Sequence, residues 1–327
     1  MPSLAEAMSS WQWGQGKFKE VFGARLPGSF ADNWPADKRI AILLTFDTQG
    51  DVDAAAAWAS DPNAFWPGGQ INYCDLTMRE YDILEGVPRV ARILRKHDVL
   101  GTFLFCGLTA EWYPDSLKSV LASGHEIGVH GYRHVPLCSL TAEEEREEVE
   151  RATEAVSKVL GGMPKGWRSP KYTTTERTVD YLRDFGYSWH SDFHDTDFPY
   201  VLEKDGRPIV EIPAGHDDWS MYLMLGSGTP APMGGTPYGT TEGVLSTLKA
   251  EFDVLYEESA DGPRLFQWCM HPKISGRPFR AAVLDRLIAY MKEHDGVWFA
   301  TCQEVAELGL PAPVEASSSA DARVAGR

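Results

Sequence analysis

A near-continuous apolar run at residues 40–46, which ends abruptly at Asp47, constrains the fold more than any other feature of the 327-residue chain. Such a run is typical of a strand buried on both faces, and strands of that kind occur in parallel sheets covered by helices. Strand-like runs that alternate with helical patterns follow at 101–106, 126–130, 207–212, 264–270 and 297–300. This alternation of about seven strand–helix units without a linker predicts one α/β domain, folded as a distorted TIM-like (β/α)7 barrel.

The segments outside these units define the expected domain limits. Residues 1–38 are irregular and rich in Trp, Gly and Pro, and we expect them to wrap a barrel domain that spans 39–310. Residues 311–327 are rich in Ala, Ser and Pro, which predicts a disordered tail. Two long connections, 54–85 and 213–240, carry several aromatic residues, and we expect them to be loops that cover the barrel mouth.

Helix starts are predicted where a Thr precedes a Glu by three residues, which is the pattern of a capping box. The pairs are Thr141–Glu144, Thr173–Glu176 and Thr301–Glu304. They predict one helix from Thr141 to Leu160, a second from Thr173 to Gly186, and a third that begins at Thr301.

Charge and cysteine content exclude several classes of partner. The chain has 47 acidic residues and 31 Lys or Arg residues, a net charge of −16, which argues against nucleic acid and anionic membranes as partners. The sequence contains no run of 18 apolar residues, so it predicts no transmembrane helix. Its first residues do not have the pattern of a secretory signal peptide, so we expect a cytoplasmic protein. The five cysteines lack CxxC spacing, which indicates reduced thiols without a disulfide frame or a cysteine-bound zinc ion.

Polar residues gather where predicted strands end, which is where barrel enzymes place their chemistry. Asp47 closes the first strand and is followed by Asp51 and Asp53, so three carboxylates suited to a metal ion or a general base lie close together in the sequence. His130 and His134 follow another strand. Imidazoles four residues apart reach one metal ion if the chain turns between them.

Three further polar groups follow later strands. They are Trp167-Arg168-Ser169-Pro170, Asp217-Asp218-Trp219 and Met270-His271-Pro272-Lys273. An Arg at a strand end is suited to pairing with a catalytic carboxylate and holding it ionised. Any one of the five groups alone is more often structural, as an acidic turn or a surface Arg. Their joint occurrence at strand ends favours a single active site.

These groups, in this order, resemble the five motifs of the polysaccharide deacetylase family, also called the NodB-homology or carbohydrate esterase 4 family. The resemblance covers about residues 38–305 and rests on Thr45-Phe46-Asp47, His130-Gly131-Tyr132-Arg133-His134, Arg168-Ser169-Pro170, Asp217-Asp218-Trp219 and Met270-His271-Pro272. Asp51-Val52-Asp53 with Trp58 resembles the signature of a cytoplasmic branch. That branch contains peptidoglycan-deacetylase-like proteins, metal-independent allantoinases and cyclic imide hydrolases.

The resemblance implies a division of roles among these residues. A divalent metal, zinc in the first place, is held by two His and an Asp and lowers the pKa of bound water. The histidines are His130 and His134. An Asp paired with Arg168 takes the water proton, and His271 protonates the leaving nitrogen. Substrate contacts are implied for Tyr132, Asp218 and Trp219.

The three acids fit this scheme in two ways. The family pattern has one Asp directly after the strand and a ligand Asp one or two positions later, where this chain has a Thr and a Gln. Strand register favours Asp47 as the base, with Asp53, or else Asp51, as the metal ligand. The spacing to Trp58 instead favours Asp51 as the base and Asp53 as the ligand.

We therefore expect a metal-dependent hydrolase of non-peptide C–N bonds, which acts as a deacetylase or on a small amide, imide or ureide. The absence of a signal pattern and the two long connections favour a small molecule over a sugar polymer. The alternatives are a metal-independent, allantoinase-like hydrolase and a non-catalytic protein of the same fold that binds a sugar or ureide. The resemblance also implies a homo-oligomer, a dimer or a tetramer.

Overall fold

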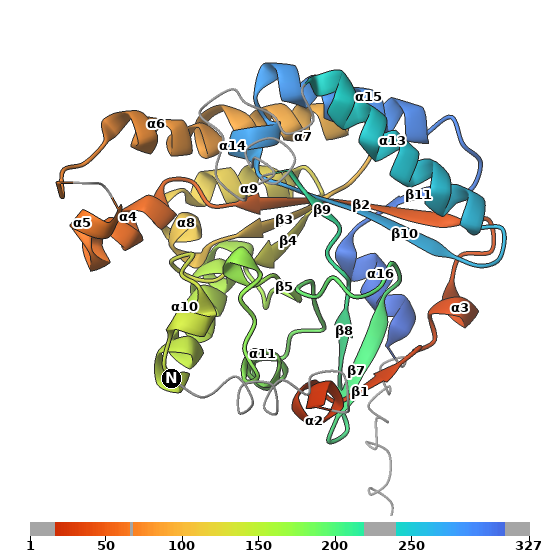
Figure 1. Cartoon of the computed structure of the whole chain (residues 1–327), viewed down its shortest axis with the longest axis horizontal. Helices are drawn as coiled ribbons and strands as arrows, with labels where there is room; N and C mark the ends of the chain where they lie inside the picture. The colour runs from red at the N-terminus through yellow and green to blue at the C-terminus, as the bar shows by residue number, and fades with distance from the viewer. Residues whose placement is uncertain (1–16, 66–67, 219–239, 311–327) are drawn as a thin grey trace, which may run out of the picture.

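The computed structural model describes residues 17–65, 68–218 and 240–310 (Figure 1). Strand β2 (Ile40–Thr48) is the strand predicted from the apolar run, and all of its residues are buried. It pairs in parallel with β10 (Arg264–Met270) and β3 (Thr102–Phe105), while β11 (Val297–Ala300) pairs with its first half. Strand β2 is therefore an interior strand with three neighbours, and it carries Asp47 to the edge where the parallel strands end.

The parallel strands form an arc in the order β8-β6-β5-β4-β3-β2-β10. The remaining strands of the arc are β4 (Glu126–Val129), β5 (Gly166–Trp167), β6 (Trp189–His190) and β8 (Arg207–Glu211). The short strand β9 (His216–Asp217) pairs with β10 at the other end. Within the described residues no ladder joins β8 to β9 or β10, so the sheet curves without closing. The carboxyl ends of these strands face the same side, as the barrel prediction requires.

Helices flank the arc and connect its strands (Figure 1). Those up to β5 are α2 (Phe18–Phe22), α3 (Phe30–Asn33), α4 (Val52–Ser60), α5 (Pro62–Phe65), α6 (Tyr73–Tyr81), α7 (Val87–Lys96), α8 (Gly107–Trp112), α9 (Pro114–Ala122) and α10 (Ala142–Leu160). Those after β5 are α11 (Thr178–Phe185), α13 (Thr241–Glu258), α14 (Pro272–Ser275), α15 (Pro278–Met291) and α16 (Cys302–Gly309). Capping boxes open α10 at Thr141 and α16 at Thr301, as predicted.

Two local predictions are wrong. The connection 54–85 is largely helical, because it is rich in Ala and because the Asn72 side chain accepts hydrogen bonds from the first backbone N–H groups of α6. The helix expected to start at Thr173 begins at Thr178 instead. The Thr173 hydroxyl accepts from Leu137 N and donates to Pro170 O, so it is engaged outside the helix.

Two features at the end of the arc were not predicted. Strand β7 (Tyr200–Lys204) forms an antiparallel pair with β8, and β1 (Ala24–Leu26) adds to β7, so part of the N-terminal segment lies against the domain. Most of the connection 213–240 and the whole tail 311–327 lie outside the described residues, so the expectations for them stay predictions.

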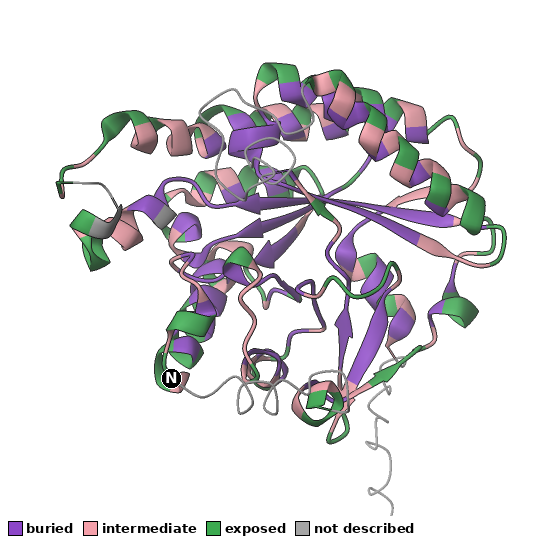
Figure 2. Cartoon of the chain, viewed as in Figure 1, coloured by how far each residue is buried: buried purple, intermediate pink, exposed green. Residues whose placement is uncertain are grey.

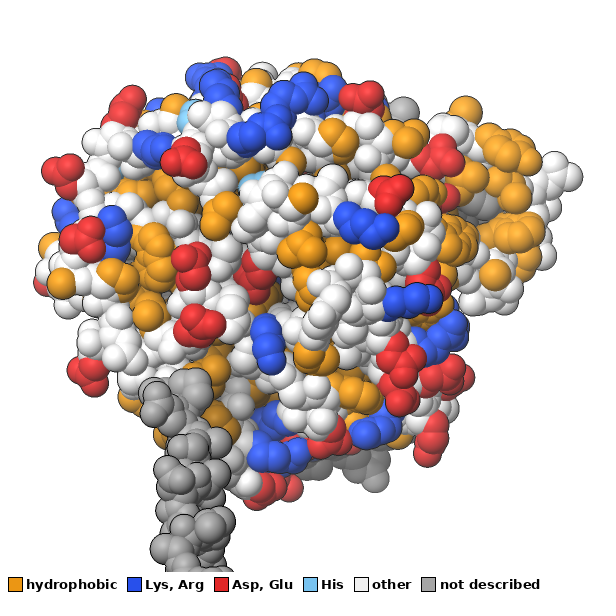
Figure 3. All heavy atoms as spheres, turned by 180° about the vertical axis from the view of Figure 1, so that it is seen from behind, with side chains coloured by type: hydrophobic (Ala, Val, Ile, Leu, Met, Phe, Trp, Pro, Cys, Tyr) orange, Lys and Arg blue, Asp and Glu red, His pale blue; other side chains and the backbone are white. Residues whose placement is uncertain are grey.

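Burial follows the strands and the inner faces of the helices (Figure 2). Acidic and basic side chains are interspersed over the rear face (Figure 3). All five cysteines are free thiols in the structure. Among the described helices none is long and apolar enough to cross a membrane.

Candidate active site

Asp47 at the end of β2 is paired with Arg168, which directly follows β5. Arg168 Nη1 donates to Asp47 Oδ1 at 2.8 Å and to Thr45 Oγ1 at 3.0 Å. Its other nitrogens donate to the carbonyl and hydroxyl of Ser191 at 3.2 and 3.0 Å. Asp47 is 2% exposed and Arg168 is 0% exposed, so the pair is an internal ion pair whose orientation these hydrogen bonds fix.

The environment keeps Asp47 ionised. Burial raises the pKa of Asp47, but the Arg168 guanidinium lowers it more, with further electrostatic contributions from the neighbouring His130 and His271 rings, and the resulting pKa is about 2. At neutral pH the carboxylate is therefore an acceptor. Its second oxygen, Oδ2, lies 3.7 Å from His130 Nε2 and accepts from the Cys269 thiol at 3.5 Å.

His271, directly after β10, has the opposite protonation. Its Nδ1 lies 2.7 Å from Asp218 Oδ1, and Asp218 Oδ2 accepts from His271 N and from the Ser275 hydroxyl. Burial lowers the pKa of His271, but Asp218, Asp217 and Asp47 raise it more, to about 9. The ring is therefore an imidazolium at neutral pH, with Nδ1–H donating to Asp218.

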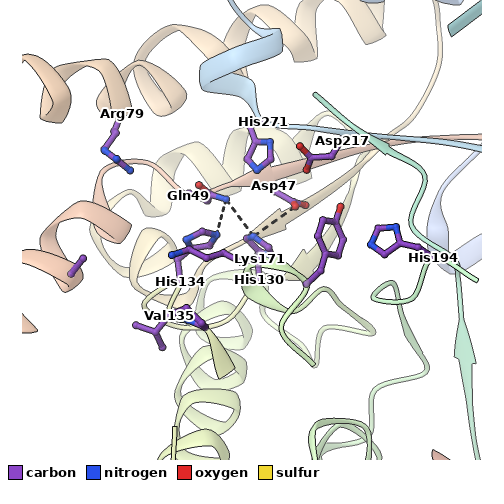
Figure 4. Close-up of a pocket in the computed structure, with 13 residues that line it drawn as sticks. Asp47, Gln49, Arg79, His130, His134, Val135, Lys171, His194, Asp217 and His271 are labelled. Atoms are coloured by element: carbon purple, nitrogen blue, oxygen red, sulfur yellow. Dashed lines mark hydrogen bonds and ion pairs between the residues drawn. The ribbon is translucent and has the colours of Figure 1, made fainter. Parts of the chain in front are cut away.

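His130 and His134 converge on one side chain, that of Gln49. Gln49 Nε2 lies 2.9 Å from His134 Nε2 and 3.4 Å from His130 Nε2 (Figure 4). Gln49 Oε1 accepts from Lys273 Nζ at 2.6 Å. His134 has a left-handed backbone, with φ of 58°, so a turn between the two histidines brings them together as the HxxxH spacing predicts.

A cavity of about 680 Å³ joins these groups. It is lined by Asp47, Gln49, Ala57, Arg79, His130, His134, Val135, Pro136, Lys171, Tyr172, His194, Asp217 and His271. In Figure 4 the Asp47 carboxylate lies between the His271 ring above it and the His130 ring below it. The size suits a single small ligand or one end of a larger one.

Tyr172 is a pocket residue that sequence reasoning missed. Its hydroxyl is buried and has no nitrogen or oxygen hydrogen-bond partner among the described residues, and it interacts with the Cys269 thiol. Burial raises the pKa of Tyr172 well above its usual value, so the phenol keeps its proton. Lys171 and Tyr172 both have left-handed backbones, with φ of 54° and 52°. Strain of this kind in consecutive pocket residues is characteristic of functional sites, and only the structure reveals it.

Other predicted residues lie elsewhere. The Asp51 carboxylate accepts from the Tyr113 hydroxyl at 2.8 Å, and Asp51 precedes helix α4. The Tyr132 hydroxyl bonds to Glu111 and Arg151, and Tyr132 is not among the described pocket-lining residues. The Asp53 side chain and Trp219 lie outside what the structure describes, so their roles stay predictions.

The donor set at the two histidines does not fit a divalent ion. The group between their Nε2 atoms is the Gln49 amide nitrogen, which carries hydrogens and offers no lone pair to a metal. A second cluster, Asp217, Asp218 and His271, has ligand atoms within 4.8 Å of one another. In this cluster His271 Nδ1 lies 2.7 Å from Asp218 Oδ1, so the imidazolium and the carboxylate are already paired with each other.

Comparison with known proteins places these features in a family. The sequence profile of the polysaccharide deacetylases matches residues 79–190. The crystal structure of a putative polysaccharide deacetylase from Mycobacterium smegmatis is 32% identical, with a TM-score of 0.71, over 84% of this chain and 92% of that one. This likeness confirms the expected fold, the (β/α)7 barrel of NodB-like deacetylases.

Two further relatives carry different names. The crystal structure of Puue allantoinase is 26% identical, with a TM-score of 0.74, over 88% of this chain and 94% of that one. A peptidoglycan deacetylase from Helicobacter pylori is 24% identical over 81% of this chain and 95% of its own length. Proteins similar to this chain over most of its length thus include both deacetylases and an allantoinase.

Proposed function

The chain belongs to the polysaccharide deacetylase family, and from that premise we propose that its pocket hydrolyses the C–N bond of a small amide, imide or ureide, with Asp47 as general base and His271 as general acid. Enzymes of this family hydrolyse C–N bonds other than peptide bonds.

The observation that carries the proposal is the opposite protonation of two groups in one cavity. Asp47 has a pKa of about 2 and is a carboxylate at neutral pH, whereas His271 has a pKa of about 9 and is an imidazolium. Hydrolysis of an amide needs a group that removes a proton from water and one that protonates the leaving nitrogen. Both line the same cavity.

The proposed reaction has two steps. Water attacks the carbonyl carbon as Asp47 Oδ2 takes one of its protons, and the carbonyl π electrons move to the oxygen. The oxyanion electron pair then re-forms the C=O bond as the C–N bond breaks, and the C–N electron pair takes the proton from His271 Nε2 while Nδ1–H remains bonded to Asp218. After the products leave, Asp47 gives its proton to solvent and His271 takes one from solvent, which restores the starting pair. The buried Tyr172 hydroxyl, which has no nitrogen or oxygen partner among the described residues, donates to the developing oxyanion.

The expected zinc ion enters this proposal only as an alternative. Deacetylases of the family are generally metal-dependent. Here the expected ligand set consists of His130, His134 and either Asp51 or Asp53. The Gln49 amide already bridges the two histidines, and Asp51 accepts from Tyr113, while the Asp53 side chain lies outside the described residues. We therefore favour the metal-independent form of the hydrolase and derive no step through an ion.

The pocket admits two classes of substrate. A cavity of about 680 Å³ lies in the usual range for small-molecule sites and accepts a small ring or one end of a larger ligand. The likeness to an allantoinase is consistent with a ureide or cyclic amide. The likeness to a peptidoglycan deacetylase supports a second candidate, an N-acetyl group on a sugar whose remaining rings lie outside the cavity. We also propose that the protein is cytoplasmic and forms a homo-oligomer.

The test is a substrate panel with wild type and His271→Ala. We expect wild type to open hydantoins, succinimides or allantoin faster than it releases acetate from chito-oligosaccharides. His271→Ala should lower kcat by ~10²–10⁴-fold, the usual effect of losing one proton donor. The matched control is His97→Ala, because His97 forms a similar contact with Asp285, at 2.6 Å, outside the pocket.

Two results would contradict the proposal. Faster acetate release from the sugars than ring opening would shift the assignment to the second candidate. Equal kcat in His271→Ala and wild type, on a substrate with a poor leaving group, would remove His271 from the acid role.

A further inference from the structure

We infer that the Gln49 carboxamide, held by the Lys273 ammonium, fills the position between His130 and His134, so that no divalent metal binds between these two histidines in the resting form. The inference deepens the proposed function, but its test needs no substrate. It assigns roles to two residues, Gln49 and Lys273, that the motif pattern leaves without one.

The orientation of the Gln49 amide follows from its neighbours. Lys273 Nζ only donates hydrogen bonds, so the amide atom 2.6 Å from it is the oxygen. The amide nitrogen then faces the two histidine rings, at 2.9 Å from His134 Nε2 and 3.4 Å from His130 Nε2. The two hydrogens of one NH2 group can thus point at two ring nitrogens.

The tautomer of His130 agrees with this assignment. His130 Nδ1 lies 3.0 Å from the carbonyl oxygen of Arg168, which can only accept, so Nδ1 carries the hydrogen. In the neutral ring Nε2 then presents its lone pair to the Gln49 amide. A histidine that ligates a metal is oriented in the same way, through a second-shell bond from its other nitrogen. The ring is therefore set for a partner at Nε2, and the partner is an N–H group.

The charge around this point also disfavours a dication. Gln49 is neutral, and the Lys273 ammonium touches its oxygen. Asp47, whose Oδ2 lies 3.7 Å from His130 Nε2, is already paired with Arg168 at 2.8 Å. Zinc sites in proteins use His, Cys or carboxylate ligands. An ion placed here would meet two imidazoles, an amide and a nearby ammonium whose repulsion is weakly screened because Lys273 is 6% exposed.

A buried carboxylate locks the two partners together. Asp82, which is 0% exposed, accepts from Gln49 N and Gly50 N through Oδ2, both at 2.8 Å, and from Lys273 N through Oδ1 at 2.9 Å. Thr109 adds a 2.6 Å bond to Gln49 O. Asp82 thus ties the end of β2 to the start of α14. Gln49 and Lys273 are held in register before any ligand arrives.

The first measurement is the metal content of wild type. The protein is incubated with excess Zn²⁺ or Co²⁺, passed over a desalting column and analysed for metal and for the visible absorption of bound Co²⁺. We expect ion content far below one per chain and no cobalt spectrum. One ion per chain that is lost in His130→Ala and His134→Ala would overturn the inference.

The second measurement uses Gln49→Asp combined with Lys273→Met, which supplies a carboxylate and removes the competing cation. We expect this variant to retain one ion per chain and to show the Co²⁺ spectrum, both of which disappear when His134→Ala is added. A folded double variant that binds no Co²⁺ would contradict the role given to the two side chains. If the double variant is unfolded by circular dichroism, Gln49→Asp alone replaces it.

Gln303→Asp is the matched control, because Gln303 lies on α16 and its amide donates to Glu307. It should leave metal content unchanged. Failure of the metal-binding measurements would leave the hydrolase proposal standing with a metal-dependent mechanism. Failure of the substrate panel would leave the metal-binding result standing.

Discussion

Two histidines that line the same pocket differ in the form of the imidazole that the fold stabilises. His271, after β10, has Asp218 at its Nδ1, and its pKa is raised to about 9 despite burial. His130, after β4, has the Arg168 carbonyl at its Nδ1 and the Gln49 amide nearest its Nε2; burial lowers its pKa, and Asp47 offsets only part of this.

The difference comes from the partner atom on Nδ1. A carboxylate stabilises an imidazolium, whereas a carbonyl fixes the tautomer without adding a charge. The side of the pocket at β10 therefore holds a proton that can be given away. The side at β4 holds a lone pair that an amide already occupies. Three substitutions test this comparison, starting with the one of largest expected effect.

Asp47→Asn removes the carboxylate that lies between the rings of His130 and His271. We expect kcat to fall by about 10⁴-fold, the upper end for loss of a general base, because Asn does not take a proton from water. Arg168 would also lose its charged partner, so thermal unfolding must be measured on the same sample.

Asp51→Asn is the control for Asp47→Asn, because it separates the two interpretations of the acidic run. If Asp51→Asn is inactive while Asp47→Asn retains turnover, Asp51 is the base and the assignment from strand register fails. An active Asp51→Asn supports Asp47.

Tyr172→Phe sharpens the question of what stabilises the oxyanion. We expect kcat to fall by about 10²–10³-fold, the usual cost of losing one oxyanion donor, with little change in stability because within the described chain the hydroxyl loses only its weak interaction with the Cys269 thiol. Tyr187→Phe is the control: its hydroxyl bonds to Thr153, so it should lose stability and keep kcat. The reverse pattern would exclude Tyr172 from the reaction.

Asp218→Asn makes His271 resemble His130 and should have the smallest effect at neutral pH. Activity requires protonated His271, so wild type should hold a plateau and decline as pH rises through about 9. Without the Asp218 charge the pKa of His271 falls toward its ordinary value of about 6.5, and the decline should move to lower pH. An unmoved alkaline limb in a pH–kcat profile would show that another group causes it.

The sequence predicts the strand-end groups well, because buried parallel strands have a pattern of their own and their ends share one edge of the sheet. Asp47, Arg168 and His271 come together for that reason. The role of Gln49 was not predictable, since its partner Lys273 is 224 residues away in the chain. Tyr172 was missed because its place in the pocket depends on the left-handed backbone at 171–172, which the residue types there do not predict.

The most direct test of the comparison is the protonation of the histidines in solution. Long-range proton–nitrogen NMR at pH 7 on uniformly labelled protein distinguishes imidazolium from each neutral tautomer, and the chain has only 9 histidines to assign by substitution. The account predicts that His271 is an imidazolium while His130 is neutral with its hydrogen on Nδ1. A neutral His271, or a His130 that carries hydrogen on Nε2, would contradict it.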